Sequence, residues 1–202
     1  MKSPLRRATD QGFTLTELLV VTVLFAIVGA IVTTVSVTGL HHQTEVENRG
    51  DAVAQARTAL ERVDRDIRSA YPLLAASGSQ LVLREVLSSA TRTVTYTASN
   101  GQLVMNQSDV PTSGGATRTT RNVLLRNLVA TDSNPIFSFS PIPGYVAPAG
   151  SGVNASTCAM SGGTSVDPGC VGTITVHVQV QPPSLPAPVS ISDNGTELRN
   201  AH

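Results

Sequence analysis

Residues 12–40 of the 202-residue chain read GFTLTELLVVTVLFAIVGAIVTTVSVTGL. From residue 18 to residue 40 there are 23 positions without a charged side chain. A helix rises 1.5 Å per residue, so about 20 residues cross the hydrocarbon core of a bilayer. The stretch therefore predicts a transmembrane helix over residues 13–40.

The residues before the apolar stretch predict its orientation. Residues 1–12 carry Lys2, Arg6 and Arg7 against Asp10, a local charge of +2 in a chain whose net charge is zero. Cationic flanks stay on the cytoplasmic side of a membrane. We therefore expect a cytoplasmic N-terminus and an exported C-terminal part. An ordinary secretory signal peptide has a shorter apolar segment that ends at a small-residue cleavage site, and this stretch lacks both properties.

Glu17 lies at the edge of the apolar stretch, four residues after Phe13. A carboxylate at this depth is costly unless it has a partner or a function. A plain signal anchor that holds an unrelated domain has no use for such a charge. The position of Glu17 therefore favours a helix that pairs with another charged group.

The run GFTLTELLV at residues 12–20 resembles the processing and methylation motif of type IV prepilins. The resemblance implies that residues 1–12 are a leader, and that a prepilin peptidase cuts between Gly12 and Phe13 and then methylates the α-nitrogen of Phe13. It also implies that Glu17 pairs with the α-ammonium of a neighbouring subunit and fixes the register between subunits. Two features depart from many members of the family: Thr16 replaces an aliphatic residue, and no proline interrupts the apolar helix.

A looser similarity points to one class within this family. Residues 59–70 (ALERVDRDIRSA), 94–104 (VTYTASNGQLV) and 198–200 (Leu-Arg-Asn) resemble the J-type minor pseudopilin of type II secretion. The resemblance implies a structural, non-enzymatic subunit that is inserted in the inner membrane and then joins a pseudopilus. Its implied partners are other pilin or pseudopilin subunits, the prepilin peptidase and the inner-membrane assembly platform. The alternatives are a minor pilin of a type IV pilus or competence pseudopilus, which serves adhesion or DNA uptake, and an anchored catalytic domain.

The helix is expected to continue beyond the membrane as an amphipathic segment over residues 41–74. One face carries an apolar stripe, formed by Val46, Val53, Ala56, Leu60, Val63, Ile67, Ala70 and Leu74. Such a one-sided stripe is typical of a helix that covers a core. Pro72 disfavours helical geometry at Tyr71 and therefore marks the end of the helix near that residue.

Residues 75–202 are expected to form a β-rich domain. Alternating polar and apolar residues predict strands, and Asn100-Gly101 is a strong hairpin signal. The expected strands are 80–86, 92–98, 102–106, 123–128, 136–139 and 172–181, with loops at 107–119 and 141–169 and a last short hairpin around Asp193-Asn194-Gly195. The predicted fold class is α+β and pilin-like: a long N-terminal helix, transmembrane in its first half, packed on an antiparallel sheet.

Cys158 and Cys170 are the only cysteines, and they flank a loop rich in glycine and serine. On the exported side of a membrane, disulfides persist. We therefore predict a bridge between these two residues; two unrelated thiols are the alternative. Zinc is not expected, because two cysteines without a nearby histidine pair do not complete its ligand set.

No cofactor is expected, because the sequence holds no phosphate-binding loop, dinucleotide fingerprint or nucleophile elbow. The fragments 132–134 and 193–195 resemble pieces of calcium loops, but each supplies too few oxygen ligands, and turn capping is the preferred interpretation. Arg118, Arg121 and Arg126 form a small basic cluster. Nucleic acid is not the expected partner, because no aromatic residues are interleaved with these arginines.

Overall fold

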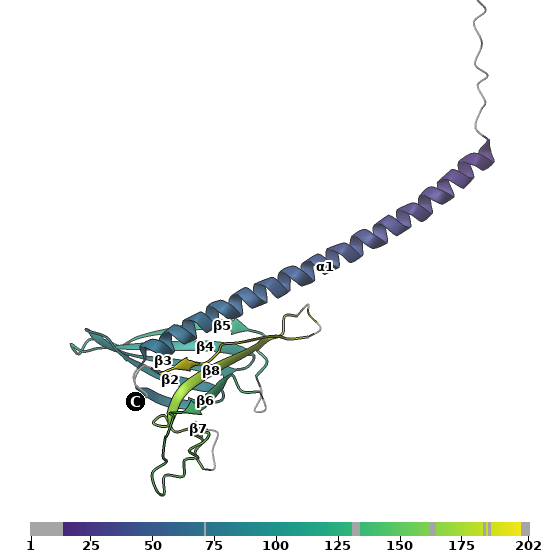
Figure 1. Cartoon of the computed structure of the whole chain (residues 1–202). Helices are drawn as coiled ribbons and strands as arrows, with labels where there is room; N and C mark the ends of the chain where they lie inside the picture. The colour runs from purple at the N-terminus through teal and green to yellow at the C-terminus, as the bar shows by residue number, and fades with distance from the viewer. Residues whose placement is uncertain are drawn as a thin grey trace, which may run out of the picture. The chain divides into compact units, whose positions relative to one another are not determined.

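The computed structural model describes residues 14–70, 72–130, 134–161, 165–183, 185 and 187–198, without the side chains of His41 and His42. The leader, the junction Gly12-Phe13 and the fragment Asp132-Ser133 lie outside the described residues. Within these residues a single helix is followed by ten strands. Figure 1 labels α1 and several of the strands. The chain divides into two compact units, residues 1–46 and 47–202.

Helix α1 runs without interruption from Leu15 to Ser69. The predicted extension to Leu74 is wrong, because strand β1 already occupies Leu73–Ser77. Pro72 has no backbone N–H to donate and restricts the residue before it, so the helix ends ahead of it and the chain becomes extended.

In the first unit, α1 exposes apolar side chains over its whole circumference; Leu18 and Phe25 are 60% and 80% exposed. The hydroxyls of this segment are satisfied within the helix. Thr33 donates to the carbonyl of Gly29 at 2.8 Å, and Thr38 donates to that of Thr34 at 2.9 Å. A segment whose backbone and hydroxyl groups need no water suits a bilayer. By length and composition, α1 can cross a membrane once.

The second unit contains the strands, which all pair in antiparallel fashion. One sheet has six strands in the order β5-β4-β3-β2-β1-β7, and the other has the order β10-β8-β6, with β9 also paired to β8. The bounds are β1 Leu73–Ser77, β2 Gln80–Val86, β3 Ala90–Ser99, β4 Gln102–Pro111, β5 Arg118–Arg126, β6 Phe137–Pro141, β7 Ser165–Val166, β8 Val171–Val180, β9 Val189–Ser192 and β10 Thr196–Glu197. The α+β fold with a long helix on antiparallel sheets is confirmed.

The core lies between the C-terminal part of α1 and the sheets. The buried helix residues are Ala52, Ala56, Ala59, Leu60, Val63, Ile67 and Ala70. The first three of these buried residues are alanines, and their small side chains leave room for a close approach between the helix and the strands. The predicted stripe began too early, because Val46 is 71% exposed.

The hairpin predicted at Asn100-Gly101 is confirmed. Asn100 and Gly101 have φ angles of 50° and 67°, as a two-residue hairpin turn requires, and β3 pairs with β4 over ten residues. The final hairpin is wrong: β9 and β10 do not pair with each other but lie one after the other along β8. The Asp193 carboxylate accepts hydrogen bonds from the N–H groups of Val176 and Gly195. These bonds hold residues 193–195 against β8, between β9 and β10.

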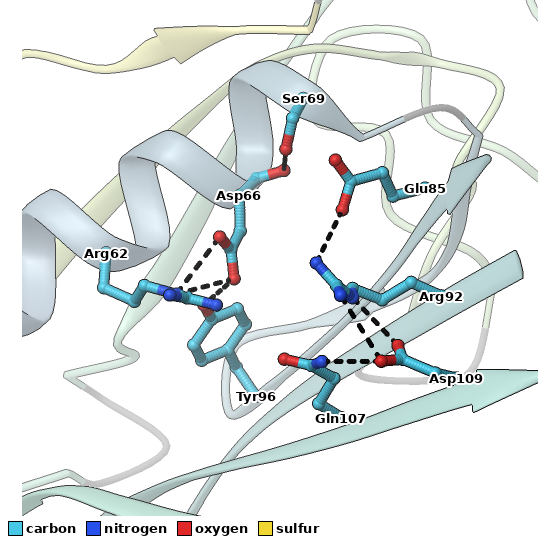
Figure 2. Close-up of polar contacts among 8 residues, drawn as sticks. All are labelled: Arg62, Asp66, Ser69, Glu85, Arg92, Tyr96, Gln107 and Asp109. Carbon is cyan, nitrogen blue, oxygen red and sulfur yellow. Dashed lines mark hydrogen bonds and ion pairs between the residues drawn. The ribbon is translucent and has the colours of Figure 1, made fainter. Parts of the chain in front are cut away.

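A buried polar contact joins α1 to the six-stranded sheet (Figure 2). The Tyr96 hydroxyl donates to Asp66 Oδ2 at 2.6 Å, and Arg62 Nε donates to the same oxygen at 3.2 Å. Tyr96 is fully buried. Burial first, and then the Asp66 carboxylate, raise the pKa of Tyr96 far above its ordinary value, so the phenol keeps its proton and donates.

Replacing Tyr96 with Phe is expected to lower the free energy of unfolding by about 1.5–3 kcal/mol, because a hydrogen bond to a carboxylate is lost in the core. Denaturant unfolding of the full chain in detergent micelles measures this change. Tyr145→Phe is the matched control: the Tyr145 hydroxyl donates to Asp167 at 3.1 Å from a partly exposed position. A loss for Tyr96→Phe no larger than that of the control would contradict the anchoring role.

Candidate functional site

The first turn of α1 is fixed by Thr14, which precedes the first helical residue. Its hydroxyl oxygen accepts the N–H of Glu17 at 3.3 Å, and its carbonyl accepts the N–H of Leu18 at 3.2 Å. A threonine at this position satisfies one of the N–H groups that have no partner within the helix. This capping role of Thr14 is not among the predictions from sequence, although the spacing Thr14-x-x-Glu17 is typical of a helix start.

Glu17 lies in this first turn and is exposed. A carboxylate there is favourable, because the N-terminal end of a helix carries partial positive charge. Among the residues that the structure describes, no cation forms an ion pair with Glu17. The arrangement therefore offers an anionic group at the start of an apolar helix to a cation from another source.

Cys158 and Cys170 are joined by a disulfide in the structure, with their Cα atoms 5.4 Å apart. Both residues are fully buried. Cys170 immediately precedes β8, and its carbonyl accepts the N–H of Ile142 at 2.9 Å. The bridge thus ties the long loop after β6 to the start of β8. Within the described part of the chain, no cluster of three or more His, Cys, Asp or Glu side chains could hold a metal ion.

Sequence reasoning missed a charged cluster on β2, β3 and β4 (Figure 2). Arg92 Nε donates to Asp109 Oδ1 at 2.8 Å, and a second Arg92 nitrogen lies 3.5 Å from Glu85 Oε2. Gln107 donates to Asp109 as well, at 3.0 Å. The signal was present: a two-residue turn at Asn100-Gly101 fixes the register and places Arg92 opposite Asp109.

The cluster has two carboxylates, Glu85 and Asp109, around one guanidinium, Arg92. The hydrogen bond from Arg92 lowers the pKa of Asp109, and the Asp109 carboxylate in turn raises the pKa of Arg92. Both groups are partly exposed, so the pair contributes little stability. Asp109 also stands directly across from Arg118 of β5, whose charge contributes to lowering the pKa of Asp109, so this carboxylate is shared between Arg92 and Arg118.

The basic cluster predicted from sequence lies on one strand. Arg118, Arg121 and Arg126 all belong to β5, the outer strand of the six-stranded sheet, and all three are exposed. No described contact joins them to the disulfide. They form a separate feature of the second unit.

Comparison with known proteins adds one finding. Residues 7–33 match the prokaryotic N-terminal methylation motif. The match spans part of the basic leader, the Gly12-Phe13 junction, Glu17 and most of the apolar segment. No curated protein and no solved structure matches the chain.

The loop bridge gives a test of its own. Non-reducing mass mapping of exported protein is expected to find the peptides of Cys158 and Cys170 linked. Reduction is then expected to lower the free energy of unfolding by roughly 3 kcal/mol, because a closed loop of this size restricts the unfolded chain. Recovery of both thiols freely alkylated before reduction would reject the bridge.

Proposed function

We propose that this chain, a type IV prepilin-like protein by its methylation motif and its fold, is a structural minor pseudopilin of a type II secretion pseudopilus. The observation that carries the proposal is the position of Glu17. Glu17 lies in the first turn of α1, directly before 23 uncharged residues and inside the matched methylation motif. The protein is anchored in a membrane by a single span, and its role is structural and not enzymatic.

Processing is the first step of this function. The basic leader holds the precursor with residues 1–12 in the cytoplasm and residues 41–202 outside the inner membrane. Gly12 has no side chain to obstruct a peptidase, which cleaves the bond between Gly12 and Phe13 and then methylates the new α-nitrogen. The mature chain then begins one residue before Thr14, which caps the helix.

Pairing is the second step. Cleavage creates an ammonium group at Phe13, beside the positive end of the α1 dipole, where a cation is unfavourable. A carboxylate from Glu17 of a neighbouring subunit offsets this charge. Between packed apolar helices the effective dielectric is low, so an unpaired charge there is costly and a paired one fixes the axial register. The partners are therefore other pilin or pseudopilin subunits on the inner-membrane assembly platform.

The choice of secretion over piliation is supported by the J-type resemblance at residues 59–70 and 94–104. In this chain those residues supply most of the buried face of α1 and the β3–β4 hairpin. The arginines of β5 favour the second candidate, a minor pilin of a type IV pilus or competence pseudopilus that takes up DNA. Deletion in the native host separates them: loss of exoprotein secretion with intact piliation and transformation supports the first, and the reverse pattern supports the second.

Processing can be measured by counting amines, because Lys2 is the only lysine in the chain. A cleaved chain retains one amine, the α-nitrogen of Phe13, whereas an uncleaved chain has the α-amine of Met1 and the Lys2 amine. We expect protein from the native host to take one acyl label, on N-methyl-Phe13, by mass spectrometry. Two labels at Met1 and Lys2 in cells that contain the peptidase would exclude processing.

Assembly is tested with Glu17→Ala. Loss of the carboxylate leaves an ammonium unpaired among packed helices, at a cost on the order of 3 kcal/mol or more, so incorporation into the fibre should fall about a hundredfold. The measurement is cross-linking of the variant to partner subunits, with membrane insertion and cleavage monitored in parallel. Glu61→Ala, an exposed acidic position farther along α1, is the control. Equal incorporation of both variants would remove any register function from Glu17.

A further inference from the structure

Strand β5 has one paired edge and one open edge. It ends the six-stranded sheet and bonds to β4 on one side, and no segment among the described residues pairs with its other side. The open edge is nine residues long, Arg118–Arg126. Its outward N–H and C=O groups form a template onto which another extended segment can add.

The usual means of closing such an edge are largely absent from β5. It contains no proline, and its one irregularity against β4 lies near its end, between Leu103 and Val104 of β4. Residues 118–123 therefore keep a regular ladder. The charges on the strand are three arginines, with no acidic residue.

A groove of 440 Å³ adjoins this edge on the α1 side. It is lined by Ala54, Gln55, Thr58, Ala59, Arg62 and Leu124. Figure 1 shows β5 beside the part of α1 that packs on the sheet. An added strand lies about 4.8 Å from β5, and every second side chain on it points toward the helix side. These side chains would enter the groove, where small and apolar groups predominate.

The opposite face of the same edge is cationic. Arg121 and Arg126 stand across from Asn106 and Gln102, which alternate along β4 with the buried Leu103 and Met105. Arg121 therefore lies on the face turned away from α1, whereas Arg126 lines a pocket with Asp51 and Gln55 of α1. In the described part of the chain Arg121 has no carboxylate partner. The side chain of an added strand that stands beside Arg121 should be acidic.

We propose that the open edge of β5 binds an extended segment of a partner protein in which apolar and acidic side chains alternate. The apolar set enters the groove beside Ala54, Thr58 and Leu124, and the acidic set faces Arg121. Pairing of β5 with β5 of a second copy is disfavoured, because it would bring arginines together. A nucleic acid could use the arginines, but neither the backbone edge nor the apolar groove.

The test uses the full chain in detergent micelles and a fluorescent peptide of about eight residues, an ordinary strand length, with alternating valine and glutamate. Anisotropy is expected to show saturable binding. Arg121→Glu should weaken the affinity about tenfold, because an attractive cross-strand pair becomes repulsive. Arg65→Glu, at an exposed position of α1, should leave the affinity unchanged. A peptide with lysine in place of glutamate should not bind.

Backbone pairing is tested on the unaltered protein with two further peptides, N-methylated on one or the other set of alternate residues. Only one set faces β5 in an added strand, so one peptide should bind like the parent and the other should fail. Equal binding of both, or no binding of the parent peptide, overturns the proposal.

Binding of a single-stranded oligonucleotide that is lost in Arg121→Glu, without peptide binding, would assign the strand to nucleic acid. None of these outcomes depends on Glu17, so the proposed assembly function stands or falls separately.

Discussion

A membrane-spanning segment has to satisfy its backbone and hydroxyl groups without water, and this constraint shapes α1. Over its first part, threonine and serine hydroxyls donate to carbonyls one turn earlier, and the first free N–H groups are partly met by Thr14. The Glu17 carboxylate cannot be satisfied in this way, because it has no proton to donate to a backbone carbonyl. A charge at the edge of an otherwise uncharged membrane segment is costly without a partner, and a simple membrane anchor has no use for it.

Past the membrane segment the same helix meets a different requirement, because it now packs on strands. The small side chains of Ala52, Ala56 and Ala59 and the larger ones of Val63 and Ile67 are all buried on this face of the helix. Asp66 and Tyr96 add a directional contact that apolar packing lacks, so it fixes how the helix is rotated on the sheet. Strand β5 ends the six-stranded sheet and therefore keeps one open edge, and its neighbour β4 carries Asp109 of the charged cluster.

Much of this arrangement follows from the sequence, and the failures have physical causes. The strong two-residue turn at Asn100-Gly101 fixes both the hairpin and, by counting outward, the Arg92–Asp109 pair. The alternation in β8 predicts its buried face correctly. Short strands such as β1 and β7 carry too few residues to show a period, and the final segment pairs with β8 through contacts that no local pattern encodes. The predicted helix extends to Leu74 because this residue continues the seven-residue apolar spacing of α1, although in the structure it belongs to strand β1.

The central claim is that Glu17 meets the amino terminus of a neighbouring subunit. Since the mature chain has no lysine, a zero-length carbodiimide reaction in native fibres can join its carboxylates only to amines of neighbours or to a Phe13 nitrogen, its own or that of another copy, and the masses of the linked peptides distinguish these products. We predict an amide between Glu17 and the amino-terminal residue of an adjacent subunit, identified by mass spectrometry. Fibres that contain the processed protein but yield only unlinked Glu17, while exposed carboxylates do cross-link, would contradict the account.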